Sequence, residues 1–247
     1  MVDLRRPESQ SAFEQAAQGS WRDVFVDPCT GDWRDRWFLD GDVGTVSTGP
    51  DGMELRAGPE HGNDAHHMVL WTHDCFEGDV KMDFEYARLD SATSCVNILY
   101  IQATGSGDGP YTSDISEWNE LRRVPSMATY FDHMNTYHIS YAAFPMDADT
   151  TSYIRGRRYM PGATGLDGTD LEPDYFPTGL FDPGVAHKIT VIKKGQALDM
   201  RVEHPGGVDT FHMANPDSPP ITTGRIGLRH MFTRSARYRN FRVSTPD

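Results

Sequence analysis

The sequence predicts an all-β protein built from antiparallel strands that form a sandwich or jelly roll. Short runs of alternating apolar and polar residues follow one another along the chain, and clusters of Gly, Pro, Asp and Asn separate them. Helix-forming patterns are scarce. Strands at short spacing with turn residues between them are typical of antiparallel sandwiches, whereas parallel sheets need helical segments between their strands.

One short helix is expected near the N-terminus. Ser11 and Glu14 match a capping box, in which two side chains satisfy free amides of the first turn, and Gly19 ends the helix after about Gln18. Turns at residues 50–52 and 193–197 indicate hairpins. Strands are expected at residues 37–39, 45–47, 53–57, 66–72, 78–89, 94–104, 136–144, 187–194, 197–204, 208–214, 224–230 and 236–243.

Two long segments, 105–135 and 145–186, interrupt the regular strand spacing. Both are rich in Gly, Pro, Asp, Tyr and Arg, and both far exceed an ordinary hairpin loop. Long ordered loops on a β scaffold commonly carry binding and catalytic residues. We therefore expect one domain over residues 1–247, with an N-terminal extension at 1–19 that holds the short helix, and two functional loops.

The charge balance limits the class of partner. The chain has 23 Lys and Arg against 36 Asp and Glu, a formal net charge of -13, which opposes binding to nucleic acid or to an anionic membrane. Residues 188–247 nevertheless carry 10 basic and 5 acidic side chains. We expect no nucleic-acid or membrane partner, but a local basic site is compatible with this distribution.

The compartment is predicted from targeting signals and cysteines. The sequence has no apolar run of about 18 residues, the minimum for a membrane span, and its first residues lack the apolar stretch of a secretory signal. The chain has three cysteines, Cys29, Cys75 and Cys95, so they cannot all pair within it, and they lack the CxxC spacing of zinc or redox sites. We expect reduced thiols in a cytoplasmic protein, or a secreted or periplasmic protein if a leader has been removed.

The strand at 136–144 presents a candidate functional histidine. Period-two alternation places His138 on one face and the apolar Tyr137 and Ile139 on the other. The apolar face is the expected core face, so His138 falls on a polar face such as the floor of a groove. The alternative is a solvent-facing or satisfied structural histidine.

Adjacent histidines in the strand at 66–72 argue against a simple zinc site. His66 and His67 would point to opposite faces of a strand, so they could not chelate one metal ion from it. One of them must share a face with apolar neighbours. We expect no cofactor, although loop carbonyls and carboxylates could bind a structural calcium ion.

Two amide side chains lie in a strand that is otherwise apolar. Asn97 shares a strand face with Leu99 and Ile101, and Gln102 falls on the opposite face. A buried amide must find partners inside the protein or contact a ligand. Both interpretations stay open for each residue.

Arginines and a tyrosine form a cluster within the second long segment. Arg155, Arg157 and Arg158 precede Tyr159, and the planar guanidinium of arginine can bind a carboxylate through two hydrogen bonds. A phenol beside such cations can take part in proton transfer. Alternatively, these arginines pair with nearby Asp and Glu. Arg229 belongs to a further basic group on the C-terminal strands.

Two further features suit carbohydrate chemistry. Trp118 is one of several aromatic residues in the long segments, and such rings stack on the apolar faces of sugars or simply anchor loops. Asp83 and Glu85 share a strand face, as the paired carboxylates of a glycosidase would, although their strand has the alternation of an ordinary half-exposed strand.

Several of these segments together resemble a known family. The pattern is similar to that of concanavalin-like jelly rolls of carbohydrate-active proteins, and most closely to the YesU-like family, which occurs with bacterial polysaccharide utilisation systems. The resemblance covers about residues 20 to 245. It implies a concanavalin-like sandwich of two antiparallel sheets. The segments that carry it are 32–41, 52–57, 67–71, 78–86, 224–231 and 238–243.

The resemblance also implies roles for individual residues. Concanavalin-like polysaccharide lyases abstract the C5 proton of a uronate with a His or Tyr, use a Tyr as acid, and neutralise the carboxylate with Arg, Gln, Asn or His. His138 would be the base or the neutraliser, with Tyr159 or, if the strand bulges, Tyr141 as acid and Arg157 beside them. The implied substrate-binding residues are His67, Asn97, Gln102, Trp118, Arg158 and Arg229.

The resulting functional prediction is a carbohydrate-active enzyme. The main hypothesis is a lyase that cleaves an acidic, uronate-containing poly- or oligosaccharide by β-elimination. The alternatives are a non-catalytic sugar-binding module and a glycoside hydrolase with paired carboxylates. The sequence leaves the oligomeric state open.

Overall fold

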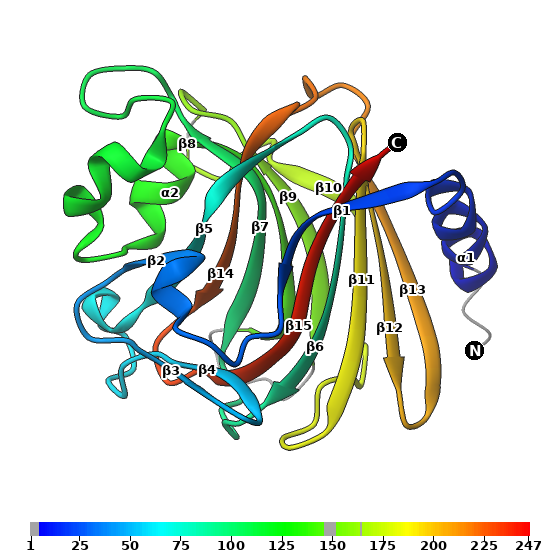
Figure 1. The fold of residues 1–247 in the computed structure, drawn as a ribbon. Helices are drawn as coiled ribbons and strands as arrows, with labels where there is room; N and C mark the ends of the chain where they lie inside the picture. Colours follow the sequence, from blue (N-terminus) through cyan, green and yellow to red (C-terminus); the bar gives the residue numbers. More distant parts are fainter. Residues whose placement is uncertain (1–4, 146–151, 164) are drawn as a thin grey trace.

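The computed structural model describes residues 5–145, 152–163 and 165–247, which form an antiparallel sandwich of fifteen strands (Figure 1). The predicted all-β class is confirmed. The helical elements are α1 (Arg5–Ala16), η1 (Trp33–Asp35), η2 (Asp64–His66), η3 (Ile115–Arg122) and α2 (Met127–His133). The strands are β1 (Trp21–Asp27), β2 (Trp37–Asp40), β3 (Thr45–Gly49), β4 (Gly52–Arg56), β5 (Met68–Glu77), β6 (Val80–Arg88), β7 (Cys95–Gly105), β8 (Met134–Phe144), β9 (Tyr153–Tyr159), β10 (Asp170–Tyr175), β11 (Ala186–Lys194), β12 (Ala197–His204), β13 (Gly207–Ala214), β14 (Thr223–His230) and β15 (Ser235–Pro246).

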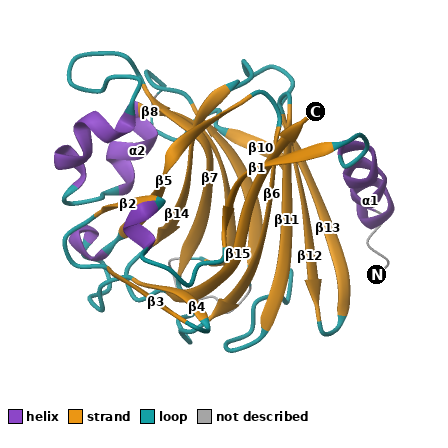
Figure 2. Cartoon of the chain, viewed as in Figure 1, coloured by secondary structure: helices purple, strands orange, loops and turns teal. Residues whose placement is uncertain are grey.

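The strands divide into two facing layers, here called the front and back sheets (Figure 2). The front sheet has the order β2-β5-β14-β7-β8-β9-β10, and the back sheet has the order β13-β12-β11-β6-β15-β4-β3, with β1 on β15. β10 pairs with β9 and, through Glu172 and Ala214, with β13, which joins the two layers along one edge. The strand order brings β14 between β5 and β7, so segments far apart in sequence meet on one face.

The main core lies between the two sheets. Val80, Met82 and Phe84 alternate along β6 and are at most 1% exposed, as the sequence pattern predicts for an inward face. Full burial of each such side chain stabilises the fold by about 1.5 to 3 kcal/mol. Tyr141 of β8 and Tyr238 of β15 cross this core and join through their hydroxyls at 2.7 Å.

The predicted hairpin turns are present. Gly49 faces Gly52 across the β3–β4 turn, and Lys194 faces Ala197 across the β11–β12 turn. Gly195 has a φ of 59°, a left-handed conformation that glycine adopts without steric cost. All twelve expected strands are found; the strand at 197–204 has the predicted bounds, and the others differ at one or both ends.

The expectation of a long loop at 145–186 was wrong. The described part of this segment contains β9 and β10, which extend the front sheet beyond β8; residues 146–151 and 164 lie outside the described part. The sequence pattern did not predict these strands because they contain Gly, Pro and charged residues. β10 pairs with β9 and β13, which only the tertiary fold brings beside it. β1 was also missed.

The expectation of a loop at 105–135 was wrong as well. The segment contains η3 and α2, and Figure 1 shows it against the outer face of the front sheet. Ile115, Trp118 and Tyr130 from this segment are at most 3% exposed and form a second apolar layer with Trp71 and Tyr100 of the sheet. Residues 106–133, here called the cover, therefore form part of the folded core.

Two local predictions need correction. α1 begins at Arg5, so Ser11 and Glu14 lie within the helix and do not cap it. The helix docks on the back sheet, where Ser9 Oγ donates to Thr210 O at 3.0 Å. His66 belongs to η2 and His67 is its C-cap, so both histidines precede β5 and neither lies in the strand predicted at 66–72. Within the described residues, no helix is long and apolar enough to cross a membrane.

Candidate functional site

A row of side chains crosses the outer face of the front sheet. Trp71, Gly227, Tyr100, His138 and Arg157 lie opposite one another in successive strand pairs, from β5 through β14, β7 and β8 to β9. Residues directly opposite in antiparallel strands project from the same face. The register therefore collects aromatic, imidazole and guanidinium groups on this face, and the cover lies over the aromatic part.

Gly227 makes room for the aromatic part of this row. A Cβ atom at this position would lie 2.5 Å from the Trp71 ring, closer than real Cβ contacts allow. Without that atom, Trp71 lies over the glycine and stacks on Tyr100, with ring centroids 5.2 Å apart. Tyr130 of the cover stacks on Tyr100 from above at 5.8 Å.

His138 and Tyr159 meet beside this stack. Their ring centroids are 4.7 Å apart in an edge-to-face arrangement, and the two residues are 2% and 0% exposed. Neither His138 nitrogen has a hydrogen-bond partner among the described residues. The Tyr159 hydroxyl interacts with that of Tyr100, but no described residue meets it at good hydrogen-bond geometry. Burial, with a smaller effect of the Arg157 charge, lowers the pKa of His138 well below its ordinary value. Burial raises the pKa of Tyr159 well above its ordinary value, so one group is a neutral base and the other a protonated phenol.

Arg229 supplies a buried positive charge next to these groups. One of its terminal nitrogens, Nη2, donates to Pro125 O at 2.6 Å and to His67 Nδ1 at 2.7 Å. Its Nε and Nη1 have no partner at good hydrogen-bond geometry among the described residues, although the Tyr100 hydroxyl lies close enough for the Arg229 charge to lower the Tyr100 pKa against the larger effect of burial. No carboxylate among those residues pairs with Arg229. The guanidinium lies 4.5 Å from the centre of the Tyr130 ring, a cation–π contact that offsets only part of the burial cost.

His67 is a neutral partner of Arg229. Burial and the Arg229 charge lower the pKa of His67 to about 3. Because Nδ1 accepts from the guanidinium, the single proton of the neutral ring is assigned to Nε2, which has no hydrogen-bond partner in the described structure. The ring stacks on Phe232 at 4.9 Å. His67 therefore does not compensate the charge of Arg229.

A second buried arginine nearby is fully compensated. Arg122 Nε donates to Asp40 Oδ2 at 2.5 Å, with both side chains 0% exposed. Asp40 also accepts from Trp71 Nε1 at 2.7 Å, the Tyr130 hydroxyl at 2.8 Å and Asn119 Nδ2 at 2.6 Å. Three of these four donors belong to the cover, so Asp40 anchors the cover to the sheet.

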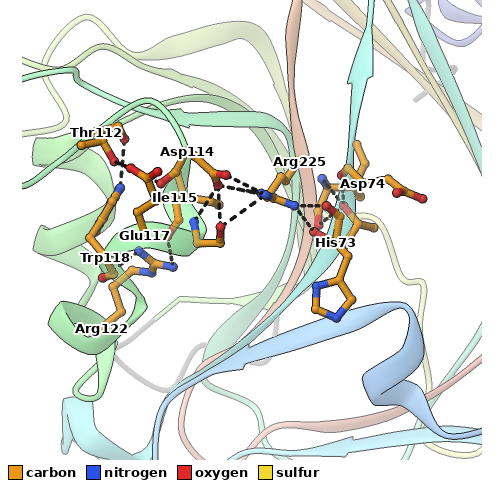
Figure 3. Close-up of polar contacts among 12 residues, drawn as sticks. His73, Asp74, Thr112, Asp114, Ile115, Glu117, Trp118, Arg122 and Arg225 are labelled. Atoms are coloured by element: carbon orange, nitrogen blue, oxygen red, sulfur yellow. Dashed lines mark hydrogen bonds and ion pairs between the residues drawn. The ribbon is translucent and has the colours of Figure 1, made fainter.

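A half-exposed ion pair ties the start of η3 to β14. Figure 3 shows Arg225 between Asp114 of the cover and the backbone of β5. Arg225 Nη2 lies 2.9 and 3.1 Å from the two Asp114 carboxylate oxygens, and its Nη1 donates to the carbonyls of Thr72 and His73. Asp114 also caps η3 by accepting from Ser116 N at 2.9 Å.

Five residues form what we call the front cluster: His67, Tyr100, His138, Tyr159 and Arg229. Each is at most 2% exposed and carries at least one polar side-chain atom without a partner in the described structure. Of these, all but Tyr100 are candidates from the sequence. His138 points away from the main core, as the alternation predicts, but its face is buried under an apolar layer and is not the floor of an open groove.

Three other sequence candidates point away from the front cluster. Tyr141 remains on the inward face and bonds to Tyr238, although the backbone is irregular just beyond it. Asn97 also points inward, where its Nδ2 donates to the Tyr86 hydroxyl at 2.6 Å. Arg158 lies over the Tyr137 ring on the inward side of β9. Their partners are internal, because strand alternation places them towards the core.

Gln102 and Trp118 have structural contacts. Gln102 has a φ of 56° in an irregular part of β7, and its Nε2 donates to Phe76 O and Gly78 O, both at 2.9 Å. Trp118 is 3% exposed, and its Nε1 donates to Thr112 O at 3.0 Å. The Trp118 ring is covered by Arg122, so it presents no free face for a sugar.

Tyr100 and Tyr130 were missed as site residues. Tyr100 resembles the apolar residues of its strand, and Tyr130 belongs to a segment without a recognisable strand pattern. The available signal was that Tyr100 shares a strand face with Ile98, opposite the face of Asn97.

Asp83 and Glu85 lie half-buried on the outer face of the back sheet, where they contact Thr190 and Asn240.

Arginines of β9 pair with carboxylates of the next strand. Arg157 Nη1 lies 3.0 Å from Asp170 Oδ1, and Arg155 Nη2 lies 2.5 Å from Asp174 Oδ2. The local pairing that the sequence left open is therefore present. No disulfide joins Cys29, Cys75 and Cys95. The described residues contain no group of three or more His, Cys, Asp or Glu arranged to hold a metal ion.

The two facing antiparallel sheets form a jelly-roll fold similar to that of galectin-like and lectin structures. The chain belongs to the family described as "Domain of unknown function (DUF1961)", whose profile matches residues 30–243. A search of curated proteins finds no match.

Solved structures share the fold at low sequence identity. A protein of unknown function with a galectin-like fold from Bacillus subtilis has a TM-score of 0.66 at 16% identity, over 92% of this chain and 100% of that one. The carbohydrate binding module CBM66 from Bacillus subtilis has a TM-score of 0.52 at 10% identity, over 85% and 95%. Lectin II from Ulex europaeus has a TM-score of 0.57 at 9% identity, over 92% and 100%.

Proposed function

We propose that this protein binds an acidic saccharide at the front cluster. The observation that carries the proposal is Arg229, a guanidinium that is 0% exposed and has two nitrogens without partners in the described structure. An unpaired buried charge costs on the order of several kcal/mol. A ligand carboxylate would accept a hydrogen bond from one of these nitrogens and compensate the charge, which offsets that cost.

The neighbours of Arg229 suit the rest of a sugar. Tyr100 and Tyr159 offer hydroxyls, and His138 offers an imidazole, all without hydrogen-bond partners among the described residues. Sugar hydroxyls both donate and accept hydrogen bonds, so they can satisfy each of these groups. The aromatic stack of Trp71, Tyr100 and Tyr130 supplies the apolar wall that saccharide sites usually contain.

The comparisons support a saccharide ligand by analogy of fold. A carbohydrate binding module and a lectin share the jelly roll, and the sequence itself resembles the YesU-like proteins. Together with the closed geometry, this favours a sugar-binding protein that does not cleave its ligand. The proposal requires no cofactor. We also propose a cytoplasmic location, where the protein would meet imported oligosaccharides, with a secreted or periplasmic location as the alternative.

Isothermal titration calorimetry tests the binding proposal. Galacturonate, glucuronate and their oligosaccharides should bind, whereas galactose and glucose should bind at least about tenfold more weakly. Arg229→Met should lose the preference for the acidic sugars. Arg201→Met, on the outer face of the back sheet, is the matched control and should bind as the wild type does. Equal binding of acidic and neutral sugars, or no saccharide binding, would refute the proposal.

The contact between His138 and Tyr159 favours a lyase as the second candidate. Neutral His138 would accept the C5 proton of a bound uronate, and protonated Tyr159 would donate to the glycosidic oxygen leaving C4. The products would be a 4,5-unsaturated uronate and a new reducing end.

One assay separates the candidates. The protein is incubated with uronate oligosaccharides while ultraviolet absorbance of the unsaturated product and reducing ends are recorded. Both signals together, lost in Tyr159→Phe, would establish the lyase. Reducing ends alone would indicate hydrolysis, and binding with neither signal would establish the non-catalytic protein.

A further inference from the structure

A half-exposed strip of side chains adjoins the front cluster on β9 and β10. Tyr153, Arg155 and Arg157 alternate along β9 on the same face as His138 and are only partly buried. Asp170 and Asp174 of β10 face them and form ion pairs with Arg157 and Arg155. The strip lies beyond the part of the sheet that carries the Trp71 stack.

The strip ends in an aromatic pair with an open face. Phe176 is 51% exposed and is the only aromatic residue among the exposed large hydrophobic residues of the described structure. Its ring centroid lies 6.5 Å from that of Tyr153, with the two planes tilted by 38°. The Arg155 guanidinium lies 5.1 Å from the centre of the Tyr153 ring and holds that ring in place. Exposed rings next to polar groups are suited to stacking against the C–H face of a pyranose.

The ion pairs supply hydrogen-bonding groups in balanced charge. The side chains of Arg155 and Asp174 are 35% and 38% exposed, and those of Arg157 and Asp170 are 14% and 45% exposed. A sugar hydroxyl can accept from a guanidinium and donate to the neighbouring carboxylate. Because each cation already has an anion, the strip favours a ring without a charge of its own.

The strip is continuous with the front cluster. Arg157 lies directly opposite His138 in the strand pairing, and Tyr153 packs against the apolar layer that contains Tyr100 and Tyr159. A first ring that lies between Arg229 and His138 would therefore have its neighbour in the same chain over the strip.

We propose that this strip is a second saccharide subsite, which takes the uncharged pyranose ring next to the acidic ring held at Arg229. The proposal rests on the proposed function. It assigns Phe176 and Tyr153 as the stacking residues and makes an oligosaccharide the preferred ligand over a single sugar. Phe176 and Tyr153 contact only the second ring, so they determine how much more tightly an oligosaccharide binds than a single sugar. Recognition of the acidic ring depends on Arg229.

Calorimetry with two series of probes tests this subsite. One series is galacturonate and its oligomers of two to four rings, and the other is glucuronate linked to one, two or three xylose rings. In wild type, the first xylose should strengthen binding about fivefold to tenfold. Phe176→Ala and Tyr153→Ala should remove this gain without changing the affinity for glucuronate alone. Val208→Ala, an exposed apolar residue of β13 with 48% exposure, is the control and should keep the gain.

The outcomes separate the two proposals. Binding that does not strengthen with the first xylose, or a gain that survives in both aromatic variants, would overturn the second subsite while leaving saccharide binding intact. Failure of every probe to bind wild type would overturn both proposals. Size-exclusion chromatography of the same proteins adds one further test, because a wild-type dimer that Phe176→Ala dissociates would assign Phe176 to a protein interface and overturn the subsite.

Discussion

His138 and Tyr159 lie edge to face with ring centroids 4.7 Å apart, and neither polar group bonds to the described protein. Two neighbouring strands, β8 and β9, place them there, since Thr136 lies opposite Tyr159 and His138 lies opposite Arg157. Such unsatisfied groups are costly in a core that serves packing alone. The relationship therefore leads to predictions for both stability and binding.

Acid should destabilise the protein below about pH 6.5 through its buried histidines. Burial holds the pKa of His138 well below its ordinary value and that of His230 at about 3, whereas an unfolded histidine titrates near 6.5. Below that pH the unfolded chain binds more protons, so the free energy of unfolding falls, by up to about 1.4 kcal/mol per pH unit and histidine.

Urea unfolding at pH 6 and pH 5 measures this effect. His138→Gln should reduce the loss of unfolding free energy between the two values by about 1 kcal/mol. His212, whose pKa is raised by its hydrogen bond to Asp199, is the control. His212→Gln should leave the slope, meaning the loss of unfolding free energy between pH 6 and pH 5, unchanged. An unchanged slope in His138→Gln would show that His138 is protonated in the folded state.

The two buried arginines should respond differently to the same substitution. Arg122→Met leaves the Asp40 carboxylate buried without its cation and should cost about 3 to 5 kcal/mol of unfolding free energy. Arg229→Met removes a charge that no described carboxylate balances. His67 can then carry its proton on Nδ1 and donate it to Pro125 O, which lies 3.2 Å from Nδ1 in the wild-type structure. We expect urea unfolding to show a free energy of unfolding that is unchanged or raised by up to about 4 kcal/mol. Equal losses in the two variants would contradict the assignment of Arg229 as uncompensated.

The ion pair in Figure 3 should control local opening of the cover. Asp114→Asn keeps a polar side chain at the start of η3 but removes the charge that binds Arg225. Because half-exposed pairs contribute about 1 kcal/mol, amide exchange within residues 112–123 should accelerate about fivefold. Hydrogen-exchange mass spectrometry measures this. Unaltered exchange in this segment, with β8 as the internal reference, would show that Asp40 alone holds the cover.

Gly227→Ala should disrupt the aromatic stack. The added methyl group would lie 2.5 Å from the Trp71 ring, which Tyr100 and Asp40 hold in place. We expect a loss of about 1 to 3 kcal/mol and a changed near-ultraviolet circular dichroism spectrum. Gly49→Ala, where the methyl group would meet open space, should have neither effect. A native spectrum in Gly227→Ala would mean that the ring can shift at little cost.

Strand alternation predicted the local direction of several site residues. It separated His138 from Tyr137 and Ile139, and it correctly raised the conflict for Tyr141, which remains in the core. Alternation succeeds here because side chains of a strand have a period of two whatever their partners. The turn residues around Gly195 and Gly52 likewise set the hairpins by backbone conformation alone.

The sequence by itself determined the all-β class, the hairpins and the faces of the strands, because each depends on neighbours in the chain. Only the tertiary structure decided that β14 lies between β5 and β7, which brings Arg229 to His67, and that β9 extends the sheet beside His138. Only it placed the cover over these groups through Asp40. Pairing between distant strands and burial beneath a distant segment depend on contacts that no local pattern encodes, and they determine which polar groups stay without partners.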